Sequence, residues 1–231
     1  MIKKKKNVTA DEFVYLASHQ LRTPITNIKW TIESLLRTEK LTERTRRYLT
    51  FMRTSTARLN DLIEVLLNIS RIEQGKVFLS SRSFDLVKFT KSFLEEYILF
   101  SKKKNISFIF KKHPATLPVV IDSGAFYNIM QSLVSNAIDY TLEGGIVEVS
   151  LEKKKRGFCL IVRDTGIGIP KKDQKHIFEK FSRGANAQIT KREGLGLGLY
   201  VAVKTVQLLN GKIWFKSQEN KGTTFYVELP L

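Results

Sequence analysis

A tight turn with an acidic residue near its start is encoded by the run Arg163-Asp164-Thr165-Gly166-Ile167-Gly168-Ile169-Pro170. The run follows an apolar stretch at residues 158–162, which predicts a β-strand that leads into Asp164. Two glycines two residues apart, followed by a proline, allow the backbone to turn sharply and to approach a ligand closely. The run therefore predicts a ligand site at a strand end. A purely structural turn capped by Asp164 is the alternative.

A second glycine-rich turn consists of Gly194-Leu195-Gly196-Leu197-Gly198 and opens an apolar helix. Backbone N–H groups at a helix N-terminus bind anions, so this turn predicts a site for a polyphosphate. The run lacks the Lys-Ser or Lys-Thr of a P-loop, and its third glycine comes one residue too early for the dinucleotide-binding pattern. Close packing of the helix is the alternative explanation.

A neutral amide, Asn136, occurs on the apolar helix that we expect at residues 123–140. Its carbonyl oxygen is a hard ligand of the kind that Mg²⁺ prefers, so Asn136 is the candidate metal ligand. Taken alone, an asparagine within a helix is more often an ordinary polar residue with its hydrogen bonds satisfied.

The N-terminal part of the chain is predicted to form two helices, at residues 11–37 and 43–73, joined by a short polar connection. Two long helices with a short connection form an antiparallel hairpin, and a second copy would complete a four-helix bundle. Packing of the hairpin on its own C-terminal domain is the alternative.

The first helix contains the run Leu16-Ala17-Ser18-His19-Gln20-Leu21-Arg22-Thr23-Pro24. Pro24 lacks an N–H group and is expected to kink the helix, and Thr23 lies one turn from His19 on the same face. A histidine beside a kink and among polar residues is a candidate for chemistry, with an ordinary solvated position as the alternative.

The rest of the chain mixes helices and strands. Strands are predicted where apolar and polar residues alternate, at residues 147–152 and 225–229, and helices at 84–100, 123–140 and 197–209. This pattern is typical of a two-layer α/β sandwich. The fold class is therefore α+β, with a helical hairpin at residues 1–75 and an α/β domain at residues 76–231.

Composition excludes several classes of protein. The 231 residues are 42% hydrophobic and include one Cys, which excludes wholesale disorder and a disulfide framework. There is no apolar run long enough for a membrane span and no secretory signal, so we expect a cytoplasmic protein. The net charge of +17 is spread over short runs, typical of solvated loops, and we expect no nucleic-acid partner.

In their order along the chain, these motifs resemble those of the sensor histidine kinases of two-component signalling. The segment around His19 resembles the family's phosphoacceptor box, the helix through Asn136 its asparagine box, and the two glycine turns its glycine boxes. The run Ile177-Phe178-Glu179-Lys180-Phe181-Ser182-Arg183 resembles the phenylalanine-bearing box between them. The resemblance covers nearly the whole chain.

The resemblance implies a dimerisation and phosphotransfer hairpin followed by an ATP-binding domain of the type found in gyrase and MutL. Asp164 would accept a hydrogen bond from the adenine amino group, Asn136 would hold Mg²⁺, and Phe178 and Phe181 would anchor a lid over the triphosphate. The residues that it assigns to the nucleotide site are Asn136, Tyr140, Asp164, Gly166, Gly168, Phe178, Phe181, Gly194, Leu195, Gly196, Leu197 and Gly198.

The resemblance also implies a reaction and its partners. His19 would take the γ-phosphoryl group of ATP and pass it to an aspartate of a response regulator receiver domain. Thr23 would place the water that dephosphorylates this receiver. Three residues depart from the family pattern, namely Gln20, Ser132 and Asp139. They leave open a catalytically weak docking or phosphatase module.

An upstream sensor region or a sensor partner is expected to supply the signal. The chain would then be the cytoplasmic part of a larger, membrane-bound sensor, or a kinase that a separate sensor controls.

Overall fold

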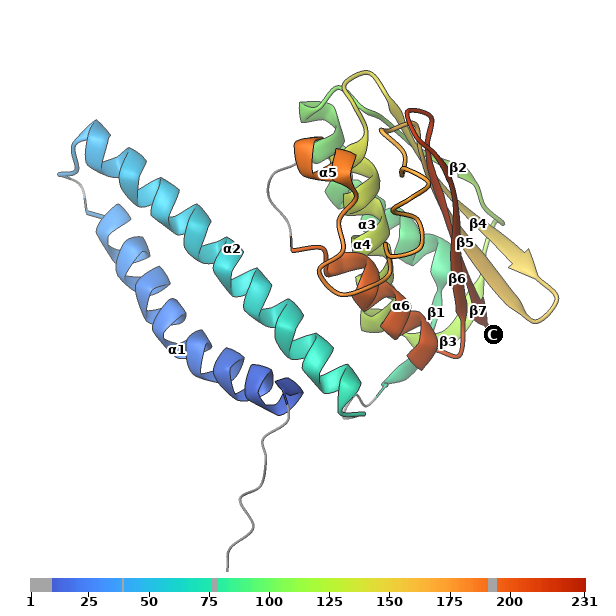
Figure 1. The fold of residues 1–231 in the computed structure, drawn as a ribbon, viewed down its shortest axis with the longest axis horizontal. Coiled ribbons are helices and arrows are strands. Elements are labelled where there is room, and N and C mark those ends of the chain that lie inside the picture. The colour runs from blue at the N-terminus through green and yellow to red at the C-terminus, as the bar shows by residue number, and fades with distance from the viewer. Residues whose placement is uncertain (1–9, 39, 76–78, 191–194) are drawn as a thin grey trace, which may run out of the picture. The chain divides into compact units, whose positions relative to one another are not determined.

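A computed structural model of the chain describes residues 10–38, 40–75, 79–190 and 195–231 (Figure 1). The chain divides into two compact units, residues 1–77 and residues 78–231. Buried apolar side chains cluster separately in the two units, so each unit is described by itself.

The first unit is a pair of helices, α1 (Ala10–Leu36) and α2 (Glu43–Glu73), which confirms the predicted hairpin. The helix α1 runs through Pro24 as one element. At the start of α2, the hydroxyl of Thr42 accepts a hydrogen bond from the backbone N–H of Thr45 at 3.1 Å and so caps the helix. The residues that cluster in the buried core of the hairpin are Ile25, Ile63 and Leu67.

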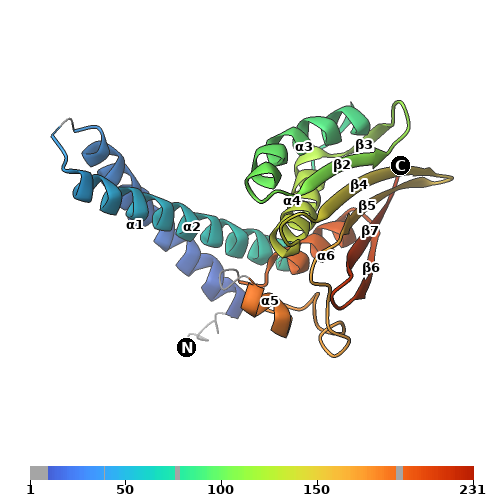
Figure 2. The same ribbon diagram turned by 90° about the horizontal axis from the view of Figure 1, so that it is seen from above.

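The second unit is a five-stranded mixed sheet with helices on one face (Figure 1, Figure 2). The strand order is β2-β4-β5-β7-β6, and β1 and β3 form a separate antiparallel pair. The elements of this unit are β1 (Ser81–Asp85), α3 (Leu86–Lys103), β2 (Ser107–Lys112), β3 (Pro118–Asp122), α4 (Ser123–Tyr140), β4 (Ile146–Lys154), β5 (Gly157–Asp164), α5 (Ala185–Thr190), α6 (Gly198–Leu208), β6 (Lys212–Gln218) and β7 (Gly222–Pro230). The predicted α+β class is confirmed.

The core of this unit lies between the sheet and its helices. Alternate residues of β4 and β7 are buried, as the sequence pattern predicts, because one face of the sheet packs on the helices. The helix α4 has the predicted bounds. The most completely buried large side chains include Phe126 and Leu133 of α4 and Phe158 and Leu160 of β5.

The helix predicted at residues 84–100 begins later than expected. Phe84 and Asp85 belong to β1, where they pair with Val119 and Pro118 of β3. The carboxylate of Asp85 also accepts hydrogen bonds from the backbone N–H groups of Val87 at 2.9 Å and Leu117 at 3.1 Å. Strand pairing and capping by Asp85 therefore delay the helix to residue 86.

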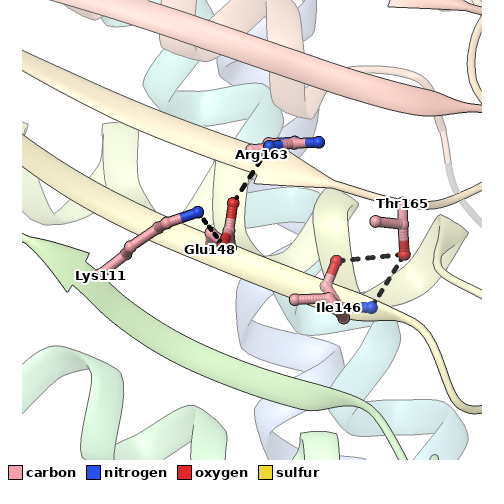
Figure 3. A network of polar contacts seen from close by, with 5 residues as sticks. All are labelled: Lys111, Ile146, Glu148, Arg163 and Thr165. Carbon is pink, nitrogen blue, oxygen red and sulfur yellow. Dashed lines mark hydrogen bonds and ion pairs between the residues drawn. The ribbon is translucent and has the colours of Figure 1, made fainter.

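The other face of the sheet carries a network of polar contacts (Figure 3). Glu148 on β4 accepts hydrogen bonds from Lys111 at 2.6 Å and from Arg163 on β5 at 3.4 Å. Just after β5, the hydroxyl of Thr165 accepts a hydrogen bond from the backbone N–H of Ile146 at 2.9 Å. These contacts link three adjacent strands and fix the position at which β5 ends.

Candidate functional site

Asp164 ends β5 with its side chain almost fully buried, at 7% exposure. Its Oδ1 accepts hydrogen bonds from the backbone N–H groups of Gly166 at 2.9 Å and Thr223 at 3.1 Å. Among the described residues, Oδ2 has no hydrogen-bond partner. Burial raises the pKa of Asp164 to about 6, although the two N–H groups act in the opposite direction. One oxygen therefore fixes the carboxylate, and the other remains available as an acceptor.

The first glycine turn packs between two other parts of the unit. A Cβ atom on Gly166 would overlap the carbonyl oxygen of Tyr140, the last residue of α4. A Cβ atom on Gly168, where φ is +61°, would overlap the carbonyl oxygen of Gln218 at the end of β6. These two glycines thus bring the turn close to other segments of the unit, and their predicted contact with a ligand stays a prediction.

One face of α4 connects the two glycine turns. Ser132, Asn136 and Tyr140 follow at intervals of four residues, so they lie on the same side of the helix. A Cβ atom built on Gly198 would lie 4.0 Å from the Cβ of Ser132, and the first glycine turn contacts Tyr140. The partly exposed Asn136 therefore lies on α4 between its contacts with the two turns.

The N-terminus of α6 has no side-chain cap. Its N-cap residue is Leu197, which is buried, whereas Asp85 and Asp122 cap α3 and α4 with their carboxylates. Among the described residues, the Cβ of Ser132 is the one atom within 4 Å of a Cβ built on Gly198, so Gly198 is less crowded than Gly166, Gly168 or Gly196. The N-cap residue of α6 thus supplies no side-chain oxygen to the N–H groups of the first turn.

The rest of the second glycine turn is only partly described. A Cβ atom on Gly196, where φ is +67°, would overlap the carbonyl oxygen of Ser182. Leu195 is partly exposed. Gly194 lies outside the described residues, so its predicted role remains a prediction.

The two phenylalanines predicted to anchor a lid differ in their environments. Phe178 packs edge-on against Phe215 and Phe225, with ring centroids 5.6 and 6.5 Å apart. Phe181 is 61% exposed and has a φ of +62°, which is unusual for a residue other than glycine. The ring of Phe181 thus lies outside the packed core, and its predicted role in anchoring a lid stays a prediction.

The predicted phosphoacceptor lies on the first unit. The backbone of α1 is helical at His19, but the side chain of His19 lies outside the described residues. Gln20 and Thr23 follow on the same helix, and both side chains are exposed. The structure thus places the three predicted catalytic residues on the hairpin and the predicted nucleotide residues on the other unit.

Two protein-family models match the chain. Residues 9–75 match the His Kinase A (phospho-acceptor) domain, and residues 121–231 match the histidine kinase-, DNA gyrase B- and HSP90-like ATPases. The chain belongs to the sensor histidine kinases. Among the described residues of this kinase, no helix has both the length and the apolar character needed to cross a membrane.

Curated relatives and solved structures agree with this family. The sensor histidine kinase WalK of Bacillus subtilis is 32% identical over 95% of the chain and 36% of its own length. The histidine-protein kinase BarA of Escherichia coli is 35% identical over 95% of the chain and 24% of its own length. Full-length ShkA in complex with AMPPNP superposes with a TM-score of 0.84 at 25% identity, over 96% of the chain and 46% of ShkA. The chain thus spans between 24% and 46% of the length of these proteins.

One departure from the family pattern has a structural counterpart. Asp139, three positions after Asn136, is one of the three residues that depart from the pattern that the sequence resembles. Lys104, at the end of α3, donates hydrogen bonds to the carbonyl oxygens of Ile138 at 2.9 Å and Asp139 at 3.2 Å, and its Nζ lies 3.9 Å from the Asp139 carboxylate. A positive charge therefore reaches this end of α4 from a different helix.

Two contributors to the site were missed by the sequence reasoning. Thr223 holds Asp164 through its backbone N–H, and a Cβ atom on Gly222, where φ is +104°, would overlap the carbonyl oxygen of Asp164. Asn186 on α5 donates a hydrogen bond to the carbonyl oxygen of Gly168. A glycine in a turn between two strands is the only local signal of the first contact, and nothing local indicates the second.

Proposed function

We propose that this chain is the catalytic part of a sensor kinase that phosphorylates its own His19 and then a response regulator. Residues 76–231 bind ATP, and residues 1–75 form the dimerisation and phosphotransfer hairpin. The observation that carries the proposal is the arrangement around α4. Its Asn136 lies between the contacts of the two glycine turns, and the first of these turns also holds the buried Asp164.

Each group of this site has a role that suits a nucleotide. The Oδ2 of Asp164 is a fixed acceptor for the exocyclic amine of adenine, which guanine lacks at that position. The uncapped N-terminus of α6 offers N–H groups to phosphate oxygens. Asn136 offers an amide oxygen to Mg²⁺, which prefers hard oxygen ligands, and we assign it as the metal ligand.

The hairpin supplies the nucleophile. ATP with its magnesium ion supplies a phosphoryl group on a stable leaving group. A neutral ring nitrogen of His19 forms a P–N bond to the γ-phosphorus as the bond from this phosphorus to the ADP oxygen breaks. Gln20 cannot accept the imidazole proton, so the proton goes to solvent and the reaction is slower than with a carboxylate at this position.

The phosphorylated His19 then serves as donor to a receiver domain. A carboxylate oxygen of the receiver attacks phosphorus, the P–N bond breaks, and His19 recovers a proton. The basic surface of the chain suits the acidic pocket of such a receiver. Thr23, one turn beyond His19, is placed to orient water for dephosphorylation of the receiver.

The exposed side of the hairpin supports a homodimer. Leu21, Ile28 and Leu35 recur at intervals of seven residues on α1, and all three side chains are exposed. A stripe with this spacing is typical of a helix that packs in a bundle. We therefore propose a four-helix bundle of two copies, placed on the cytoplasmic side and controlled by an upstream sensor region or partner.

The proposal is tested by incubating the full chain with γ-labelled ATP and Mg²⁺. We expect acid-labile, base-stable label that the His19→Gln variant loses entirely, while Gln at this position leaves nucleotide binding unchanged. Label that persists in this variant would contradict the assignment of His19.

A second function is favoured by Gln20, Ser132 and Asp139 together. A weak kinase with these residues would act mainly as a docking module or phosphatase for a receiver. It predicts loss of phosphate from a phosphorylated receiver on addition of the chain, with no label on His19. The same labelling experiment separates the two functions.

A further inference from the structure

The α5 segment, which we define as residues 182–190, is fastened to the second glycine turn at its start. A Cβ atom on Gly196 would overlap the carbonyl oxygen of Ser182 and come within 2.8 Å of the carbonyl carbon of Phe181. Both Phe181 and Gly196 have positive φ angles, so the two backbones meet at a pair of sharp turns. Movement of the start of the α5 segment would therefore shift the second glycine turn with it.

The same segment is fastened to the first glycine turn through Asn186. The side-chain amide of Asn186 donates hydrogen bonds to the carbonyl oxygens of Gly168 at 3.0 Å and Ile167 at 3.4 Å. Both partners are carbonyl oxygens, which can only accept hydrogen bonds. The NH₂ group of Asn186, and not its side-chain oxygen, must therefore face them. The Asn186 side chain is partly buried, so water competes less for these bonds than at an open surface.

A second contact supports the first. The carboxylate of Asp173 accepts a hydrogen bond from the backbone N–H of Ala185 at 2.9 Å, directly before Asn186. The backbone N–H of Asp173 in turn donates to the carbonyl oxygen of Pro170 at 2.9 Å, which follows the first glycine turn. The α5 segment is thus held at two adjacent residues, by the turn itself and by the stretch that continues from it.

The contact at Gly196 and the hydrogen bonds of Asn186 involve turns on opposite sides of the proposed nucleotide site. The first glycine turn holds Asp164 through the N–H of Gly166, and the second leads into the N-terminus of α6. The α5 segment is hydrogen-bonded to the first turn and packs closely against the second, so it links the adenine side of the pocket to the phosphate side. No residue of the phosphoryl-transfer chemistry is needed for this bridging role.

We propose that Asn186 is a positioning residue that sets nucleotide affinity by tying the α5 segment to the first glycine turn, without contacting the nucleotide. This inference rests on the proposed function, because it assumes that the pocket between the turns binds ATP. A merely structural Asn186 would instead lower the stability of the whole unit and leave affinity and turn mobility unchanged.

The matched variants are Asn186→Ala, Asn186→Asp and Thr190→Ala in the full chain. Asn186→Ala removes both hydrogen bonds, and Asn186→Asp replaces the donor with a carboxylate that repels the carbonyl oxygens of Ile167 and Gly168. The hydroxyl of Thr190 donates a hydrogen bond to the backbone carbonyl oxygen of Asn186 within α5, at 3.0 Å, so Thr190→Ala disturbs the helix and leaves the Asn186 side chain in place.

Two measurements decide the proposal. Calorimetric titration with AMPPNP and Mg²⁺ is expected to show affinity about tenfold weaker in Asn186→Ala, weaker still in Asn186→Asp, and within about twofold of the parent in Thr190→Ala. At saturating ATP, labelling of His19 by Asn186→Ala is expected to keep its rate, so that KM rises while kcat does not. Hydrogen exchange of the peptide that spans residues 164–170 is expected to be faster in both Asn186 variants only.

The outcomes separate this inference from the proposed function. If the parent chain binds AMPPNP and Asn186→Ala binds it equally well, with unchanged exchange at residues 164–170, the positioning role is overturned. If the parent itself does not bind AMPPNP, the proposed function fails, and the exchange measurement alone still tests whether Asn186 restrains the turn. A uniform loss of affinity and stability in all three variants would also overturn the proposal.

Discussion

The two units of this kinase bury their apolar residues to very different extents. The unit of residues 78–231 closes a core between its sheet and its helices, with side chains such as Phe126 and Phe158 fully buried. The hairpin has a buried cluster that, among its described residues, consists of Ile25, Ile63 and Leu67. Its large apolar side chains that remain exposed are Leu21, Ile28, Trp30, Leu35, Tyr48, Phe51, Met52 and Leu59.

This difference indicates a division of labour. A unit with a closed core can fold and bind nucleotide as a single copy, because its stability needs no partner. A hairpin with exposed apolar stripes gains its stability when a second copy covers them, so its folding depends on concentration. We therefore expect the stability of the unit with the nucleotide site to be independent of protein concentration, and that of the hairpin with the phosphoacceptor to depend on it.

The largest expected effect comes from separating the units. Residues 78–231 alone are expected to bind ATP as tightly as the full chain but to acquire no label, because His19 is absent. Residues 1–77 alone are expected to lose helicity on dilution, whereas residues 78–231 are not. Circular dichroism over a dilution series and labelling with γ-labelled ATP measure these effects.

Mixing the two fragments provides the control. Label that appears on the hairpin only when both fragments are present would support the division. A hairpin that keeps its helicity at the lowest concentrations measured would contradict it.

The next effect concerns the surface that covers the hairpin. Ile28→Glu places a charge in the exposed stripe of α1 in both copies of a dimer, which is expected to cost about 3 kcal/mol or more and to weaken association at least a hundredfold. Trp30→Glu is the matched control. Trp30 is also exposed, at 70%, but follows Ile28 by two residues and so lies on roughly the opposite side of the helix.

Sedimentation equilibrium of the full chain distinguishes these variants. We expect Ile28→Glu to sediment as a monomer and Trp30→Glu as a dimer. Equal association of the two would show that the stripe with spacing seven is not the contact between copies.

The parts of this molecule that sequence could predict are those with a local pattern. The bounds of α4 and the buried faces of β4 and β7 follow from periodicity within the segment itself. Long-range contacts carry no such pattern. The start of α3 depends on the pairing of β1 with β3, and the orientation of Asp164 depends on Thr223, 59 residues further along the chain.

The same limit applies to the glycines. Their spacing indicates sharp turns, and the structure has them. What each glycine approaches depends on distant segments, such as the end of α4 at Gly166 and the carbonyl oxygen of Ser182 at Gly196. The sequence therefore predicts the position of each sharp turn, but not the contact that requires a glycine there.

An intermediate effect is expected from the protonation of Asp164. Its folded pKa of about 6 lies above the ordinary 3.8, so the ionised acceptor is present above pH 6 and is lost as the pH falls through 6. Affinity for ATP is therefore expected to fall about tenfold for each pH unit below that value. Titration with AMPPNP between pH 5 and 8 measures this, and Asp164→Asn, which binds weakly throughout, should show no such slope.

The same raised pKa makes an opposite prediction for stability. The buried carboxyl stabilises the fold most when it is protonated, below the ordinary value of 3.8, and this contribution is lost as the pH rises through 6. At pH 7.5, nucleotide-free Asp164→Asn is therefore expected to be more stable than the parent by on the order of 2 kcal/mol. A less stable variant with intact hydrogen bonds to Gly166 and Thr223 would argue against the burial as the cause.

The smallest effect concerns the charge at the end of α4. The Nζ of Lys104 lies 3.9 Å from the carboxylate of Asp139, and both side chains are partly exposed, so their coupling is expected to be only about 0.5 kcal/mol. Lys104→Met removes the positive charge beside the Asp139 carboxylate, which lies on the same helix as Asn136. The uncompensated negative charge should weaken binding of the anionic nucleotide about twofold to fivefold. Asp139→Asn should reverse most of that loss.

A double-mutant cycle in nucleotide affinity isolates this coupling from the packing of the Lys104 side chain. The cycle is repeated at 0.5 M NaCl to make this separation clearer. Salt should screen the coupling between the partly exposed Lys104 and Asp139 charges. The hydrogen bonds from Lys104 to the carbonyl oxygens of Ile138 and Asp139 should remain. If Lys104→Met weakens binding equally with Asp and with Asn at position 139, the lysine acts as a cap on α4 and not through the carboxylate. The charge of Asp139 would then be irrelevant to the nucleotide.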